Sequence, residues 1–455
     1  MQRSLTSVLL VTLLFAQSAM AAATKPNLIV ILTDDQGYGD VGFNGSEDIR
    51  TPNMDRLARE GVRFTDGYVT YPVCGPSRAG LLTGRYQDRF GFGRNPSVNP
   101  DDVTAGLPNS ERNIAEILKP AGYRTGVIGK WHMGTHPSFH PNKRGFDYFY
   151  GFLSGGHRYF PEELVLNDVA ESRSAFDWYR TRIMQNQQRV DIDEYLTDEF
   201  SNEAVAFIER EKDEPFFLYL AYNAPHGPLQ ATDTYLDRYP DIEDDDRRTY
   251  AAMVSAVDDG IGRILEALER LGIDENTLIF FLSDNGGAQG KGSSNKPLRG
   301  FKSMPFEGGV RVPFAARWKG TLPNGVDFTQ PVSSLDILAT INARVQSPID
   351  ADKPLDGVDL LPYLTGKKKG SPHEVLFWKN YDNNWYAIRN GDDKYIHNYN
   401  GNFQFFNLKK DLSEKNNLVK RKRIAVKKNI GMISEWDEHN VAPIFPPLSS
   451  WSGNP

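Results

Sequence analysis

Four short polar segments of the chain combine residue types that could hold a metal ion and move protons. They are Asp34-Asp35, Lys130-Trp131-His132, Ala224-Pro225-His226 and Ser283-Asp284-Asn285. The two acidic segments offer oxygen ligands, which suit calcium and, less well, magnesium, and which differ from the thiolate and imidazole ligands of zinc sites. Carboxylates placed close together would repel one another without a cation between them. Taken singly, each acidic pair could also be an ordinary turn or helix-cap pair.

The only cysteine of the chain, Cys74, opens the run 74–84, CGPSRAGLLTG. Pro76 is typical of a helix start and Gly84 of a helix end, which predicts a short helix with Cys74 just before it. The free N–H groups of a helix N-terminus would stabilise an oxyanion at position 74. A lone cysteine beside an apolar stretch is more often a buried core thiol. The residue pattern alone therefore leaves a chemical and a structural role open.

Apolar runs that predict buried β-strands lie ahead of the polar segments, at 27–33, 123–129, 216–222 and 277–282. Continuous apolar strands are typical of parallel sheets covered on both faces. Helical patterns lie between them, at 51–60, 111–119, 198–209 and 250–271. This alternation predicts an α/β fold with a large doubly wound central β-sheet flanked by helices. Because ligands bind outside the carboxyl ends of strands in such sheets, we expect the polar segments to meet at one site.

The pattern changes after a polar stretch at 365–372 that contains glycine and proline. Short strand patterns follow at 375–378, 385–389, 394–397 and 403–407, and a basic helical pattern follows at 420–438. They predict a small C-terminal antiparallel sheet with one helix. We therefore expect a catalytic domain over 24–365 and a small C-terminal α+β subdomain over 372–455. The lysine run at 367–369 reads as a solvated linker.

The composition and the first residues predict an exported globular protein. A chain of 455 residues with 39% hydrophobic residues can bury a full core. Its net charge of -7 argues against nucleic acid as a partner and requires any anionic substrate to be held by a local cluster. Residues 1–21 predict a signal peptide, with Arg3 before an apolar stretch and a cleavage site at Ala19-Met20-Ala21. We expect a periplasmic or secreted protein without a membrane span.

The run Cys74-Gly75-Pro76-Ser77-Arg78 resembles the Cys-x-Pro-Ser-Arg signature of type I, formylglycine-dependent sulfatases, and Leu82-Thr83-Gly84 resembles the family's continuation of it. The resemblance extends from Pro26 to the segment 411–418 and is greatest to arylsulfatases and N-acetylgalactosamine-sulfatases of the alkaline phosphatase superfamily. It implies a sulfuric ester hydrolase in which Cys74 is oxidised to formylglycine (3-oxoalanine). The modifying partner would be a formylglycine-generating enzyme or an anaerobic sulfatase-maturating enzyme.

Residue by residue, the resemblance implies a calcium site made of Asp34, Asp35, modified Cys74, Asp284 and Asn285. It implies a catalytic set of Cys74, Arg78, Lys130, His132, His226 and Lys302. A hydrated aldehyde at position 74 would present a gem-diol, one hydroxyl of which attacks the sulfur atom. His226, or else Lys302, would protonate the leaving alcohol. His132 would then take a proton from the second hydroxyl, so that sulfate is released.

The segment 134–200 is rich in aromatic and basic residues, which suit sugar rings and sulfate or carboxylate groups. We expect His157, Arg158 and Arg94 to bind substrate. The expected substrate is a sulfated carbohydrate, a galactose- or galactosamine-containing polysaccharide or oligosaccharide, for which an algal galactan such as carrageenan is an example. The alternatives are a phosphate-ester hydrolase of the same superfamily, which would use two zinc ions, and an inactive glycan-binding relative. The Cys-x-Pro-Ser-Arg run and the shortage of further metal ligands argue against the first alternative, and the intact catalytic set argues against the second.

Overall fold

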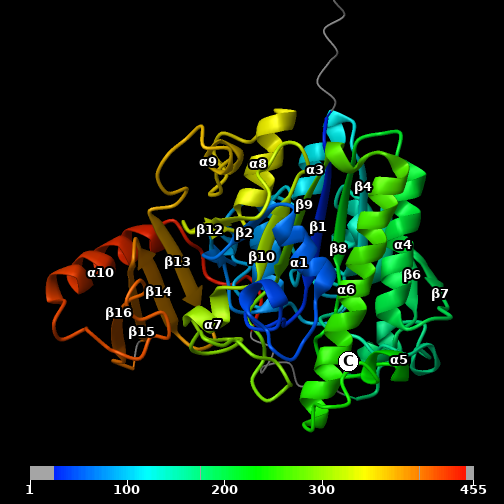
Figure 1. Ribbon diagram of the computed structural model, residues 1–455, viewed down its shortest axis with the longest axis horizontal. Coiled ribbons are helices and arrows are strands. Elements are labelled where there is room, and N and C mark those ends of the chain that lie inside the picture. Colours follow the sequence, from blue (N-terminus) through cyan, green and yellow to red (C-terminus); the bar gives the residue numbers. More distant parts are fainter. Residues whose placement is uncertain (1–24, 175, 399, 447–455) are drawn as a thin grey trace, which may run out of the picture.

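The structure of the protein is a computed structural model that describes residues 25–174, 176–398 and 400–446. The predicted signal peptide, 1–21, lies outside these residues. A ten-stranded sheet runs through the molecule between helices, and a four-stranded sheet lies to one side of it (Figure 1). None of the helices in the described ranges has the length and apolar character needed to cross a membrane.

The large sheet is mixed, and the predicted strands form its centre. The strand order is β11 (Val326–Phe328), β2 (Val62–Phe64), β10 (Phe314–Arg317), β9 (Thr277–Ser283), β1 (Asn27–Thr33), β8 (Phe216–Ala221), β4 (Arg124–Lys130), β5 (Tyr148–Phe152), β6 (Ile183–Gln185) and β7 (Gln188–Val190). Strands β9, β1, β8, β4 and β5 run parallel, whereas β10 runs antiparallel beside β9. A separate two-stranded ladder joins β3 (Gly67–Tyr68) to β12 (Val332–Ser333).

Strand β1 shows why the central runs are apolar throughout. All seven of its residues are buried, with Leu28 and Val30 in one hydrophobic cluster and Ile29 and Ile31 in another. Because successive side chains of a strand point to opposite faces, both faces of the sheet must be covered. One face packs against α2 (Cys74–Thr83), α3 (Ile114–Leu118) and α8 (Asp336–Val345). The other packs against α1 (Pro52–Arg59), α4 (Leu196–Glu211) and α6 (Asp245–Leu271).

In the central domain, two predicted helix starts were wrong by three or more residues because a capping side chain sets each of them. Helix α3 begins at Ile114 rather than at 111, since the Asn113 side chain accepts from two helix N–H groups and Glu116 returns a bond to the Asn113 N–H. Helix α6 begins five residues before the expected 250, because Asp244 caps it by accepting from the Arg247 N–H. Both departures lie at helix ends and leave the order of elements unchanged.

The small C-terminal sheet contains β13 (Val375–Asn380), β14 (Trp385–Asn390), β15 (Asp393–Asn398) and β16 (Phe403–Asn407), paired antiparallel in chain order. Helix α10 (Arg423–Asp437) packs against this sheet and forms the outer end of the molecule (Figure 1). The predicted small antiparallel sheet with one helix is confirmed, although the helix begins three residues later than expected. Three short helices, α5 (Asp233–Leu236), α7 (Glu307–Val310) and α9 (Leu361–Leu364), complete the fold.

Buried ion pairs join the small sheet to the rest of the protein. Lys394 of β15 is fully buried, and its Nζ lies 2.7 Å from Glu307 Oε1 of α7 and 3.6 Å from Glu414 Oε1. Glu414 also accepts a hydrogen bond from the Glu307 N–H at 2.8 Å. Two carboxylates and one ammonium are thus removed from water together, an arrangement that is stable only while all the partners are present.

Replacement of Lys394 should therefore destabilise the fold. Lys394→Met keeps most of the side-chain volume but leaves Glu307 and Glu414 buried without the ammonium, and we expect it to lower the free energy of unfolding by about 3–5 kcal/mol. Urea unfolding followed by tryptophan fluorescence measures this change. The control is Lys410→Met at an exposed position, which should change stability by less than about 0.5 kcal/mol. Equal stability of the two variants would contradict the account.

Candidate active site

Four neighbouring parallel strands end at the same edge of the large sheet, and each supplies polar residues from its carboxyl end. Strand β1 leads to Asp34 and Asp35, β4 ends at Lys130, β8 leads to His226, and β9 leads to Asp284 and Asn285. Main-chain hydrogen bonds fix these ends to one another, from Asp34 N to Ala224 O at 3.1 Å and from Asp284 N to Thr33 O at 2.9 Å. The structure thus brings the four polar segments together.

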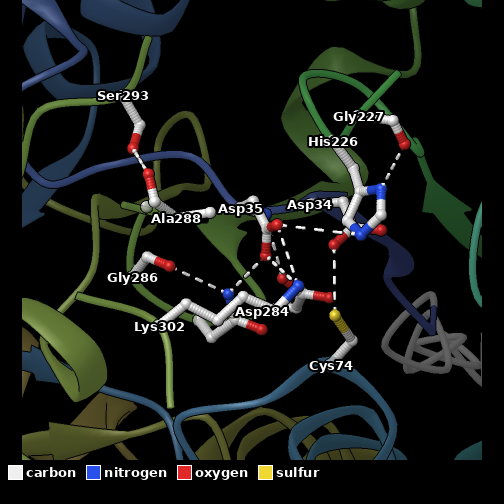
Figure 2. Close-up of polar contacts among 12 residues, drawn as sticks. Asp34, Asp35, Cys74, His226, Gly227, Asp284, Gly286, Ala288, Ser293 and Lys302 are labelled. Carbon is white, nitrogen blue, oxygen red and sulfur yellow. Dashed lines mark hydrogen bonds and ion pairs between the residues drawn. The ribbon is translucent and has the colours of Figure 1, made fainter. Parts of the chain in front are cut away.

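Three carboxylates and one thiol converge at this edge (Figure 2). One ligand atom from each of Asp34, Asp35, Cys74 and Asp284 lies within 4.8 Å of the others, and all four residues are buried. The Cys74 thiol donates to Asp34 Oδ1 at 3.4 Å. Such a set of hard oxygen atoms around a small volume is the environment that binds calcium.

Asn285 supplies an independent test of whether the cluster fits a cation. Its side-chain N–H donates to Asp35 Oδ1 at 2.7 Å and to the Gly286 carbonyl at 2.9 Å. Its Oδ1 is buried, and no described residue donates a hydrogen bond to it. A buried amide oxygen without a donor is costly, and a metal ion is a partner that would remove the cost. The donor set therefore fits a calcium ion.

Three cationic side chains surround the carboxylates. The Lys130 ammonium pairs with Asp34, Arg78 Nε lies 2.8 Å from Asp284 Oδ2, and Lys302 Nζ lies 2.7 Å from Asp35 Oδ1. The side chains of Lys130 and Arg78 are fully buried, whereas that of Lys302 is 18% exposed. Among these three cations, Lys302 is therefore the one that solvent or a ligand can reach.

Burial and pairing act against each other on the pKa values of the cluster. For Asp34, burial would raise the pKa, but the charges of Lys130, His226 and Arg78 outweigh it and hold the pKa well below its usual range. For Asp284, burial and the charge of Asp34 raise the pKa to about 7. For Lys302, burial would lower the pKa, but the charge of Asp35 raises it well above the usual value. Lys302 is thus a fixed cation.

Cys74 is the first residue of α2, not the residue before the helix as predicted. Val73 is the N-cap, and Pro76 lies in the first turn, where a missing N–H costs nothing because those N–H groups have no partner in the helix. Gly84 ends the helix in the left-handed conformation, with φ 63°, as expected. Burial, followed by the charge of Asp34, raises the pKa of the Cys74 thiol well above its usual value. The thiol is therefore protonated and a poor nucleophile.

The two predicted catalytic histidines differ in their contacts. His226 Nδ1 lies 2.7 Å from the Gly227 carbonyl, which can only accept, so Nδ1 carries a proton and Nε2 points toward Asp35 Oδ2 at 3.7 Å (Figure 2). His132 has a buried Nδ1 without a hydrogen-bond partner among the described residues. Burial, together with Lys130 and Arg78, lowers the pKa of His132 well below its usual value. Burial also lowers the pKa of His226.

The three residues expected to bind substrate lie outside the carboxylate cluster. His157 is fully buried and stacks on Phe152, with ring centroids 4.5 Å apart. Arg158 pairs with Glu163 at 3.3 Å, and Arg94 pairs with Asp382 at 2.6 Å. In the described part of the chain, no hydrogen bond or ion pair joins His157, Arg158 or Arg94 to the cluster. Their role in substrate binding stays a prediction.

Sequence reasoning did not select Tyr179, which the fold brings beside the site. A Cβ atom on Gly156 would lie 2.4 Å from the Tyr179 hydroxyl, and one on Gly155 would lie 2.7 Å from His132 Nε2. Burial raises the pKa of Tyr179 to about 12, and the charges of Lys302 and Asp34 also act on it. The paired glycines were the available signal, because two adjacent residues without side chains allow a close approach from both sides.

The chain is similar to a known protein family and to several of its members. The family model described as Sulfatase matches residues 26–346. The human N-acetylgalactosamine-6-sulfatase is 35% identical over 82% of this chain and 76% of its own length. Human arylsulfatase G is 36% identical over 80% of this chain and 74% of its own length.

A solved structure shares both the fold and much of the sequence. The crystal structure of Ps i-CgsB in complex with k-i-k-neocarrahexaose has a TM-score of 0.87 and 41% identity, and it covers 92% of this chain and 94% of its own. The match therefore includes the small C-terminal sheet as well as the central domain. The chain belongs to the sulfatase family and is a sulfuric ester hydrolase.

Proposed function

We propose that the protein removes sulfate from a sulfated galactan of the carrageenan class. The observation that carries the proposal is the placement of Cys74 against three buried carboxylates and three buried or partly buried cations. Support for the substrate class comes from the similarity to a structure crystallised with a neocarrahexaose. The predicted export would place the enzyme in the periplasm or outside the cell, where a polymeric substrate is accessible.

We further propose that Asp34, Asp35, Asp284, Asn285 and modified Cys74 hold a calcium ion. When bound, the ion would lower the pKa of a hydroxyl ligand and offset negative charge on the sulfate oxygens. The Asn285 Oδ1, which is buried without a donor among the described residues, supports its assignment as a ligand. Magnesium fits less well, because it prefers a compact octahedral site that keeps several waters.

The need to release sulfate after the attack on sulfur supports the proposed conversion of Cys74 to formylglycine. A hydrated aldehyde supplies two hydroxyl groups, one for attack on sulfur and one for the later release of sulfate, whereas a thiol supplies neither. A formylglycine-generating or anaerobic sulfatase-maturating enzyme would be the partner that installs it.

The charge balance of the site suits a sulfate ester. The carboxylates of Asp34, Asp35 and Asp284 are matched by the cations of Arg78, Lys130 and Lys302, so a divalent ion would leave an excess of positive charge for the anionic substrate. The Nε atom of Arg78 donates to Asp284 and orients its carboxylate, and the Nη1 atom of Arg78 donates to the Lys130 carbonyl at 3.1 Å. Lys302, as the partly exposed cation, is placed to contact the sulfate oxygens.

The two histidines suit proton transfer for different reasons. His226 keeps its Nδ1 proton on the Gly227 carbonyl, so Nε2 is the atom that can give a proton to the leaving alcohol. Burial lowers the pKa of His226, and an adjacent sulfate anion would raise it again because negative charge favours the imidazolium. His132, held neutral by burial and by Lys130, suits the role of a base.

The two alternative functions fit the site less well. A phosphate-ester hydrolase with two zinc ions needs two sets of ligands, but in the described residues both candidate metal groups share Asp34 and Cys74 and therefore form one centre. An inactive glycan-binding relative would not require Arg78 and Lys130 to be buried beside three carboxylates, since buried ions are costly to keep.

The test of the proposed function is sulfate release. We expect the matured enzyme to release sulfate from carrageenan oligosaccharides, measured by ion chromatography, and Lys302→Ala to lower kcat/KM by about 100-fold, as loss of a charge-stabilising donor does. Lys291→Ala, at an exposed position in the same loop, serves as the control and should change kcat/KM less than about twofold. Release of phosphate from monoesters without release of sulfate from any saccharide would reject the proposal.

Calcium should stabilise the protein as well as activate it. We expect activity to be lost in EGTA and regained with calcium, and the melting temperature to rise with calcium by the equivalent of about 2.7 kcal/mol at 100 times the Kd. Asp284→Asn should abolish this rise, whereas Asp213→Asn, whose side chain is 83% exposed, should retain it. A melting temperature of the wild type that does not respond to calcium would contradict the assignment.

A further inference from the structure

The small C-terminal subdomain carries an exposed basic surface that the proposed reaction does not use. It consists of nine residues, Lys409, Lys410, Lys415, Lys420, Arg421, Lys422, Arg423, Lys427 and Lys428. All nine are exposed, and within the described residues none of them forms an ion pair. The whole chain, in contrast, carries a net charge of -7. Positive charge is therefore concentrated on one small part of an acidic protein.

The two acidic residues within this segment do not neutralise the basic surface. Glu414 is buried and turned toward Lys394 and the Glu307 N–H. Asp411 accepts hydrogen bonds from the main-chain N–H groups of Lys415 and Asn416, at 3.1 and 2.7 Å. Both carboxylates thus accept hydrogen bonds from main-chain N–H groups and pair with none of the nine basic side chains, which remain exposed to solvent.

The packing of α10 does not require these basic residues. The buried residues of the helix are Asn429, Ile433 and Trp436, which lie on one stripe. Ile433 packs against the small sheet, and Trp436 packs against Phe377 of that sheet and against Tyr86 of the central domain. Arg423 and Lys427 stand four residues apart and repel each other, and the first turn contains no acidic residue to favour the helix N-terminus. The fold therefore tolerates an unfavourable charge arrangement, which indicates a role outside the fold.

The basic surface adjoins the segment that leads into the active site. Ser413 Oγ donates to the Pro297 carbonyl at 2.8 Å, and Arg299 donates to the Glu414 carbonyl at 2.8 Å. Arg299 lies three residues before Lys302, the partly exposed cation of the site. From this junction the surface extends over the start of α10, at the outer end of the molecule (Figure 1).

We propose that the basic surface binds a second stretch of the same sulfated polysaccharide whose ester occupies the active site. The proposal rests on the proposed function and extends it from a single sulfated sugar to an anchored polymer. A polymer with sulfate groups at regular intervals presents many anionic oxygen atoms, which lysine and arginine bind by charge-assisted hydrogen bonds. Exposed charges act through solvent, so the binding should weaken as salt increases.

The experiment compares two variants that lose equal charge. The test variant is Lys420→Gln with Lys422→Gln and Lys427→Gln, and the matched control is Lys367→Gln with Lys368→Gln and Lys369→Gln in the exposed run after α9. At low salt we expect KM for polymeric carrageenan to rise about tenfold in the test variant and less than about twofold in the control. In about 1 M salt the difference should vanish, because the screening length falls to about 3 Å.

Neither variant should change kcat, or KM for a carrageenan hexasaccharide, because neither alters a residue of the active site. Native gels that contain carrageenan measure polymer binding without turnover, and the test variant should be retarded less than the wild type and the control. This readout separates the basic surface from the proposed function, since retardation does not depend on sulfate release. Equal KM and equal retardation of both variants would overturn the proposal. So would binding of wild-type protein to vesicles of anionic phospholipid but not to carrageenan.

Discussion

The mutual repulsion of three buried carboxylates is the constraint on which the rest of the site depends. Asp34, Asp35 and Asp284 lie close together because parallel strands β1 and β9 are neighbours and end at the same edge. Without compensation this cluster would not stay ionised in a buried environment. Arg78, Lys130 and Lys302 each pair with one of these carboxylates, and the proposed calcium ion would add positive charge for the anionic substrate. Burial and the charge of Asp34 raise the pKa of the Cys74 thiol, whereas Lys130 and Lys302 act in the opposite direction.

A second buried charge cluster holds the small sheet against the central domain. Lys394 joins β15 to Glu307, which lies five residues after Lys302, and Arg299 on the other side of Lys302 donates to the Glu414 carbonyl. The segment that carries Lys302 is thus fixed at both ends by contacts with the C-terminal subdomain. The small sheet supplies none of the proposed catalytic residues, but it fixes the segment that carries Lys302. The basic surface lies beside the same segment.

Much of the fold could be predicted because the central strands are apolar throughout, and a strand such as 27–33 has few alternatives to burial on both faces. The convergence of Asp34, Lys130, His226 and Asp284 followed from the strands that precede them. Helix starts such as Ile114 depended on a single capping side chain, and the place of Cys74 within α2 depended on how far into the first turn Pro76 lies. The buried position of His157 could not be predicted, and Gly155-Gly156 gave only an indirect signal for Tyr179, because long loops fold by contacts that no local periodicity encodes.

The most direct test of the account is mass spectrometry of the peptide that contains Cys74, made on the same preparation whose sulfate release is assayed. The account predicts an aldehyde at position 74, detected by its mass and by its reaction with a hydrazide, and a specific activity that rises in proportion to the modified fraction. A fully active preparation in which this peptide carries only the unmodified thiol would contradict it.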